Sequence, residues 1–420
     1  MINFLTLLVL ITIITIFITS CNSSSNNNII GGIGNSGSSG GSGNVITLSL
    51  NNTGIPGTPV SQANNVNIGA NSEVANGLLD PNTNSLFILG NGFPSGPAAN
   101  PNVYLFKFNP AGNFDGSLTI DFTSGTNGQF GNLYIDQDTN NIYAMGGHNN
   151  GTDSDIFVAK IDKNNLSFVN SFGGVPIQGI VLLDRGNVES TGGLLVDSTN
   201  NVLYVAGYNN QGKVIIFKLN TNNGSLVSGF GSGGYKEIDV DNNSGTQEFA
   251  TDILTDGTNL IIIGEQMINP TTFKLMLFKV NPNTGNEVPG SLITIDPPSG
   301  ESFVAAALDA AILGNKVYLG ATLQPSGKSV LAVFDLNNNT ANYFTFKDNN
   351  NNDIKIFITD LYYPGTGNII YLSGINNITN NAAFIKFDTS NNSESYLIAD
   401  SSTAGRWWGN VFYIYIYLEH

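Results

Sequence analysis

The residues best suited to chemistry in this sequence are oxygen-bearing side chains that recur once in each of several repeats. Four residues before the turn that ends the first apolar run, successive repeats carry Asn76, Asn132, Gly193, Asp252, Asp309 and Asp360. Carboxylate and amide oxygens are ligands that calcium prefers. Three carboxylates facing one channel would also repel one another unless a cation or protons lay between them. These positions predict a calcium site formed by Asn76, Asn132, Asp252, Asp309 and Asp360. The alternative is a structural set that hydrogen-bonds the backbone of a neighbouring repeat.

A second calcium candidate lies between residues 239 and 248. This segment reads DVDNNSGTQE, and its Asp239, Asp241 and Asn243 match the D-x-D-x-N start of a calcium-binding loop. Its Gly245 and Glu248 are misplaced for an EF-hand, and no helical pattern flanks the segment. The alternative interpretation is therefore a polar loop between two strands.

Other kinds of catalytic site have little support in the sequence. The chain has two histidines, His148 and His420, and one cysteine, Cys21, so no zinc or copper cluster can be assembled. We expect His148, in the loop GGHNNGTDSD, to be solvated. A G-x-S-x-G match at residues 37–41 lacks the strand, turn and helix that a nucleophile elbow requires.

The elements that must position the recurring residues are short strands, because one β-rich pattern occurs about six times. In residues 192–220, GGLLVDSTNNVLYVAGYNNQGKVIIFKLN, three apolar runs are separated by polar turns, as in a β-meander. The second run of each repeat ends in a glycine, and these glycines lie roughly 54 to 61 residues apart: Gly90, Gly146, Gly207, Gly264, Gly320 and Gly374. The period predicts an all-β propeller whose first strands line a central channel; a β-helix or a β-sandwich array is the alternative.

Two of the repeats resemble known bacterial repeat families. The runs TDILTDGTNLIIIG (251–264) and GGLLVDSTNNVLYVAG (192–207) are similar to the β-propeller repeats called SBBP repeats. The segment LNTNNGSLVSGFGSGGYKEI (219–238) resembles the delta-60 repeat, although Val227 replaces that repeat's usual Asp. The resemblance covers most of residues 75–400 and implies a propeller in a secreted or surface-attached protein. Because the matching residues are structural, it implies little about activity.

The number of blades depends on how the ring closes. Residues 410–418, NVFYIYIYL, match the second run of a blade, but no complete blade follows them. An open ring would leave two bare sheet edges, so we expect residues 45–50, VITLSL, to pair with the C-terminal strands. This pairing predicts seven blades within a propeller spanning residues 45–420, with six as the alternative.

The N-terminus predicts the cellular location. Residues 1–20 form one apolar run, and Ile18-Thr19-Ser20-Cys21 resembles a bacterial lipobox, which implies cleavage before Cys21 and acylation of that cysteine. A conventional signal peptide or a membrane-spanning anchor is the alternative, and no Lys or Arg precedes the apolar run. Residues 21–44 are rich in Asn, Ser and Gly and predict a flexible linker. We therefore expect a lipid-anchored protein of the bacterial cell envelope, at the outer membrane or cell surface.

Composition narrows the function classes further. Only 11% of residues are charged and the net charge is −16, with no basic cluster, so nucleic acid is not an expected partner. The favoured hypothesis is a binding scaffold for a protein or glycan. The alternatives are a calcium-dependent lactonase or hydrolase that uses the central channel, and a structural envelope protein. Calcium is the one cofactor that the residues suggest.

Overall fold

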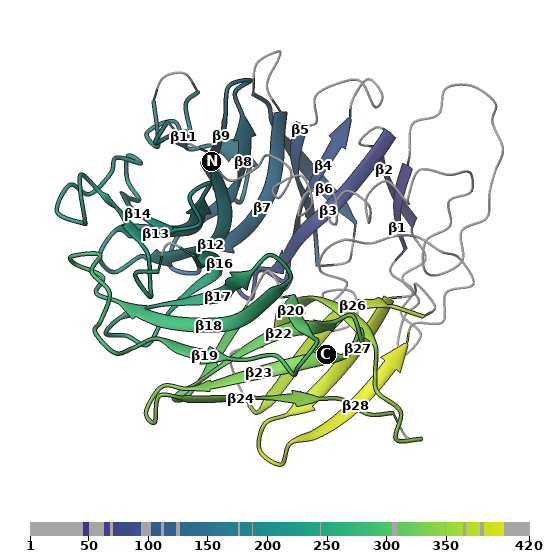
Figure 1. Ribbon diagram of the computed structural model, residues 1–420. Coiled ribbons are helices and arrows are strands. Elements are labelled where there is room, and N and C mark those ends of the chain that lie inside the picture. Colours follow the sequence, from purple (N-terminus) through teal and green to yellow (C-terminus); the bar gives the residue numbers. More distant parts are fainter. Residues whose placement is uncertain are drawn as a thin grey trace.

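The computed structural model describes six antiparallel sheets of four or five strands, arranged as the blades of a ring (Figure 1). The described residues are 45–49, 63–67 and 70–398, with gaps at 94–101, 111–112, 123–126, 175–176, 187, 244, 305–309, 349, 364–366 and 379–381. These residues are all-β, as predicted, and contain no helix, so none of them forms a helix long and apolar enough to cross a membrane.

Each blade is built from strands that are consecutive in the chain. Blade 1 contains β3 (Ala70–Leu79), β4 (Leu86–Phe93), β5 (Asn102–Phe108) and β6 (Phe114–Ile120). Blade 2 contains β7 (Asn127–Ile135), β8 (Asn141–Asn149), β9 (Ser154–Asp162), β10 (Ser167–Phe168) and β11 (Ile180–Leu183). Blade 3 contains β12 (Glu189–Asp197), β13 (Val202–Asn209), β14 (Val214–Asn220) and β15 (Tyr235–Ile238).

The second half of the ring follows the same plan. Blade 4 contains β16 (Gln247–Thr255), β17 (Leu260–Asn269), β18 (Thr272–Val280) and β19 (Ile293–Ile295). Blade 5 contains β20 (Ser302–Val304), β21 (Ala310–Leu313), β22 (Lys316–Gln324), β23 (Ser329–Asp335) and β24 (Thr340–Thr345). Blade 6 contains β25 (Ile356–Tyr362), β26 (Ile369–Asn376), β27 (Ala382–Asp388) and β28 (Ser393–Ile398).

The predicted number of seven blades is wrong, because the described residues form six. Each of the six repeats supplies all the strands of its own sheet, so no blade needs a strand from the other end of the chain. The strand at residues 45–50, β1 (Val45–Ser49), pairs instead with β2 (Ala63–Asn67) in a separate two-stranded sheet. Its expected partner, residues 410–418, lies outside the described part of the chain. Blades 6 and 1 meet through side chains, where Tyr362 and Tyr371 pack with Leu78, Leu79 and Leu86.

A bulge in the first strand explains the recurring glycines of blades 1, 2, 3, 4 and 6. Opposite Gly207, Gly264 and Gly374, the first strand carries extra residues, and the register shifts. The bulge pushes a carbonyl oxygen against the glycine, so that a Cβ on Gly264 would lie 2.0 Å from the oxygen of Phe249. Glycine is needed here for close approach of two backbones, and not for a left-handed conformation.

A lysine repeated in the third strand connects neighbouring blades. Lys218 lies directly across the ladder from Tyr204, with its ammonium 5.2 Å from that ring. The same ammonium donates a hydrogen bond to the carbonyl oxygen of Pro282 in blade 4, at 2.8 Å. Lys160 repeats the arrangement with Tyr143 in its own blade and the carbonyl of Thr221 in blade 3. The repeated lysine is therefore a structural link.

The apolar core lies between the blades because each sheet packs its face on the next one. One cluster joins Ala206 and Ile216 of blade 3 to Ile262 and Phe278 of blade 4, and all four side chains are buried. The connections therefore lie at the two ends of the ring. One end carries the links from each fourth strand to the next first strand, together with the loops between second and third strands; we call it the junction face.

Candidate metal centres

Four of the predicted ring residues are described, and all four lie buried at bulges of first strands: Asn76, Asn132, Asp252 and Asp360. In blades 1 and 2, the Nδ2 of Asn76 donates to the Oδ1 of Asn132 at 2.8 Å. The same Oδ1 accepts from the backbone N–H of Leu133, also at 2.8 Å. Two successive members of the ring are thus joined directly to each other across the blade boundary.

Asp252 makes the corresponding link between blades 4 and 5 through the backbone. Its Oδ1 accepts from the N–H of Ile253 at 2.7 Å, and its Oδ2 accepts from the N–H of Ala310 at 2.8 Å. The Gly193 position in blade 3 is filled from the next blade, because a Cβ there would lie 2.4 Å from the Oδ1 of Asp252. The one glycine at this position, Gly193, therefore leaves space for the carboxylate of Asp252 from the next blade.

The two remaining ring residues are Asp360 and Asp309. Asp360 is buried at the bulge of β25, opposite Ser373, and Asp309 lies outside the described residues. Asn76, Asn132 and Asp252 hydrogen-bond a neighbouring blade or the backbone of their own strand. These are the structural contacts that the alternative to calcium binding predicts. Calcium coordination by the five ring residues stays a prediction.

The segment from 239 to 248 brings its acidic residues together. Carboxylate oxygens of Asp239, Asp241 and Glu248 lie within 4.8 Å of one another, on the junction face between blades 3 and 4. Gln266 donates to the Oδ2 of Asp241 at 3.0 Å and to the Oε1 of Glu248 at 3.3 Å. Burial, and secondarily the charges of Asp241 and Asp239, raise the pKa of Glu248 to about 7. Asn243 stays in the loop, where its Oδ1 accepts from the N–H of Gly245.

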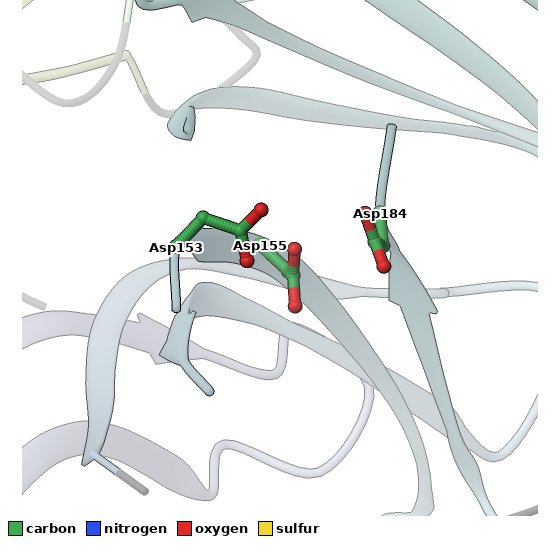
Figure 2. A group of neighbouring side chains, drawn as sticks. All are labelled: Asp153, Asp155 and Asp184. Carbon is green, nitrogen blue, oxygen red and sulfur yellow. The ribbon is translucent and has the colours of Figure 1, made fainter. Parts of the chain in front are cut away.

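A third acidic group was missed by the sequence reasoning. Asp153, Asp155 and Asp184 also have carboxylate oxygens within 4.8 Å of one another. Figure 2 shows Asp153 and Asp155 side by side, with Asp184 facing them. Asp153 and Asp155 have the D-x-D spacing that the sequence displays, but Asp184 follows β11, and only the pairing of β11 with β9 brings it near.

His148 differs from its expected environment. We expected a solvated loop residue, but His148 is at the end of β8, 6% exposed, with its ring centroid 4.5 Å from that of Phe122. The burial arises because the β8–β9 ladder continues through His148 and Asp155, so the loop is shorter than its polar sequence indicates. The Nδ1 of His148 is 3.7 Å from the Oδ2 of Asp155. The predicted lipidation site, Cys21, lies outside the described residues.

Comparison with known proteins supports the fold. No model of a known protein family and no curated protein sequence matches this chain. Among solved structures, the periplasmic gluconolactonase of Pseudomonas aeruginosa has a TM-score of 0.54 and 10% identity, over 83% of this chain and 90% of that one. Raptor of Chaetomium thermophilum has a TM-score of 0.47 and 10% identity; the match covers 79% of this chain, which spans only 25% of Raptor.

A putative 6-phosphogluconolactonase of Bacteroides fragilis is similar at a TM-score of 0.44 and 16% identity, over 75% of this chain and 82% of that one. At these identities the likeness to the gluconolactonase of Pseudomonas aeruginosa shows a propeller fold alone.

Proposed function

We propose that this protein is a lipid-anchored scaffold of the bacterial cell envelope that binds a protein or glycan on its junction face. The anchor rests on the lipobox-like sequence at Cys21 and on the linker of residues 21–44. The binding role rests on one structural observation: a hollow of about 500 Å³ between blades 4 and 5. It opens on the same face as the acidic groups of blades 2 to 4.

The lining of this hollow suits a ligand rich in hydroxyl or amide groups. It contains carboxylates (Asp296 and Glu301), hydroxyls (Thr271 and Ser299) and the amide of Gln324. A concave site with several convergent polar groups can orient a ligand through hydrogen bonds, and Pro297, Pro298 and Pro325 add apolar surface to the lining. Asp296 is held from one side by Lys274, at 2.7 Å, which fixes part of the lining.

The experiment is a binding screen of the full-length protein in detergent micelles against an array of glycans and against envelope proteins. Ser299→Arg places a large charged side chain in the hollow, at an exposed position. Ser232→Arg is the matched control, because Ser232 is exposed in a turn between the third and fourth strands, at the other end of the ring. A ligand that loses at least about tenfold in affinity with the first variant alone supports the proposal. A screen without ligands, or a ligand that is indifferent to Ser299→Arg, contradicts it.

The second candidate is a calcium-dependent lactonase or hydrolase that uses the central channel. Its support is the buried ring of oxygen-bearing side chains, where a metal ion could activate a water molecule. The hydrogen bonds of Asn76, Asn132 and Asp252 count against it, because they already engage oxygens that the ion would need. Lactone hydrolysis that depends on calcium and is lost in Asp309→Asn would favour this candidate over the scaffold. A structural envelope protein would show neither ligand binding nor hydrolysis.

A further inference from the structure

We propose that Asp153, Asp155 and Asp184 form a calcium-binding site on the outer part of blade 2. It is separate from the central ring and from the hollow between blades 4 and 5. The three carboxylates come from the loop after β8, from β9 and from the end of β11, and their oxygens converge within 4.8 Å. The proposal is independent of the proposed function, because it concerns a metal ion and not the ligand of the junction face.

Equivalent positions in blades 3 and 4 carry a lysine near the start of the third strand and an aspartate after the fourth. In blade 4, β18 carries Lys274 opposite Asp296, which directly follows β19, and the two form an ion pair at 2.7 Å. In blade 3, the ladder register continued by one residue past Val214 and Ile238 places Lys213 opposite Asp239. These two blades share the arrangement of a lysine facing an aspartate.

Blade 2 reverses the charge of the third-strand residue. The ladder between β9 and β11 ends at Ile156 and Leu183, so the next pair in register is Asp155 and Asp184. The position that is a lysine in blades 3 and 4 is thus an aspartate, and it faces another aspartate. Two carboxylates in this position repel each other, and the repulsion is relieved if a cation occupies the space that a lysine ammonium occupies in blade 4.

One of the three carboxylates has a buried oxygen without a hydrogen-bond partner in the described part of the chain. Asp155 is 2% exposed, and its Oδ1 has no hydrogen-bond partner among the described residues. Its other oxygen accepts from the amide of Asn150 at 3.0 Å. Because a buried carboxylate oxygen without a partner is costly, this atom indicates a missing ligand.

Among the described residues no lysine or arginine pairs with these three carboxylates, and the Nδ1 of His148, 3.7 Å from the Oδ2 of Asp155, leaves the Oδ1 of Asp155 without a partner. The neutral Asn150 amide also donates to Asp153, at 2.5 Å, so one donor is shared by two carboxylates. Arg185, the next residue after Asp184, stacks on Tyr235, with its guanidinium carbon 3.7 Å from the ring centroid. Burial, followed by the charges of Asp155, Asp184 and Asp153, raises the pKa of Glu189 to about 7. The negative charges of blade 2 therefore raise the pKa of a carboxyl group in blade 3.

Calcium fits the donor set better than the other common divalent ions. The three converging groups are all carboxylates, and zinc and copper prefer nitrogen or sulfur ligands. Asp184 is exposed and Asp153 is partly exposed, which leaves room for water to complete a coordination shell of six to eight oxygens. Magnesium demands a tighter octahedron and retains most of its water, so three carboxylates from three segments suit it less.

The experiment is calcium titration of the full-length protein in detergent micelles, by calorimetry and by thermal melting in calcium or in chelator. Asp184→Asn removes an exposed ligand without disturbing the core, and Asp296→Asn is the matched control at the equivalent position of blade 4. We expect calcium to raise the melting temperature of the wild type by several degrees. Asp184→Asn should weaken one binding event by at least about tenfold, and the control should not.

A second variant separates the site from other calcium-binding groups. Asp155→Lys restores the lysine of blades 3 and 4, so it should lose the same binding event and should melt in chelator at or above the wild-type temperature. Asp241→Asn, in the loop between blades 3 and 4, should leave the event intact. Unchanged calcium binding in both Asp184→Asn and Asp155→Lys overturns the proposal, as does a wild type stabilised equally by magnesium. Glycan or protein binding is not a readout, so the proposed function can fail while this site stands.

Discussion

Replacement of Gly264 by alanine tests the structural reason for the recurring glycines. A Cβ at Gly264 would lie 2.0 Å from the carbonyl oxygen of Phe249, whereas ordinary contact begins at 3.4 Å, so the two backbones must separate by 3.4 − 2.0 = 1.4 Å. Overpacking of this kind costs about 1–3 kcal/mol. The displaced bulge also holds Asp252, and loss of one charge-assisted hydrogen bond adds about 1.5–3 kcal/mol. We expect Gly264→Ala to lose about 2.5–6 kcal/mol of unfolding free energy.

The assay is denaturant unfolding of the full-length protein in detergent, monitored by circular dichroism and by tyrosine fluorescence. Gly229→Ala is the matched control, because nothing lies within 4 Å of a Cβ at that exposed turn. Its unfolding free energy should stay within about 0.5 kcal/mol of the wild type. If the two alanine variants unfold at the same denaturant concentration, the bulge does not require glycine and the reasoning is wrong.

Four further predictions follow from the sequence and the structure. Lys218→Met breaks the contact with the next blade and should cost about 2 kcal/mol in a thermal melt, whereas exposed Lys316→Met should be near neutral. Cys21→Ser should move the protein from the membrane to the soluble fraction and abolish labelling by a fatty-acid probe; retained labelling would contradict the lipobox. Glu248 has a folded pKa of about 7 against 4.5 for the free group, so its stabilising contribution is present at low pH and lost as the pH rises towards 7. In chelator, Glu248→Gln should therefore flatten the fall in melting temperature between about pH 4.5 and 7. If calcium occupies the central ring, Asp309→Asn should reduce the calcium-dependent rise in melting temperature. An unchanged rise would mean that the ring residues have a structural role and bind no calcium.

The β-propeller architecture was predictable because each blade is encoded locally. A blade needs alternating apolar runs, polar turns and a glycine at the bulge, and all of these recur in one stretch of chain, such as residues 192–238. The positions of Asn76, Asn132 and Asp252 were predictable for the same reason, because they hold one place in the repeat. The acids of residues 239–248 converge because most of that segment is one short loop.

The number of blades and the acidic group of blade 2 were decided by tertiary structure. Ring closure depends on which distant segments pair, and the sequence of β1 fits a C-terminal partner as well as it fits β2, because any strand edge can accept another strand. Asp184 is separated from Asp155 by the whole β9–β11 connection, so the repulsion between them exists only after those strands pair. The sequence by itself determined the repeating unit. The packing of one unit on the next determined that Asp252 hydrogen-bonds the following blade and that Asp155 lies buried with an unpartnered oxygen.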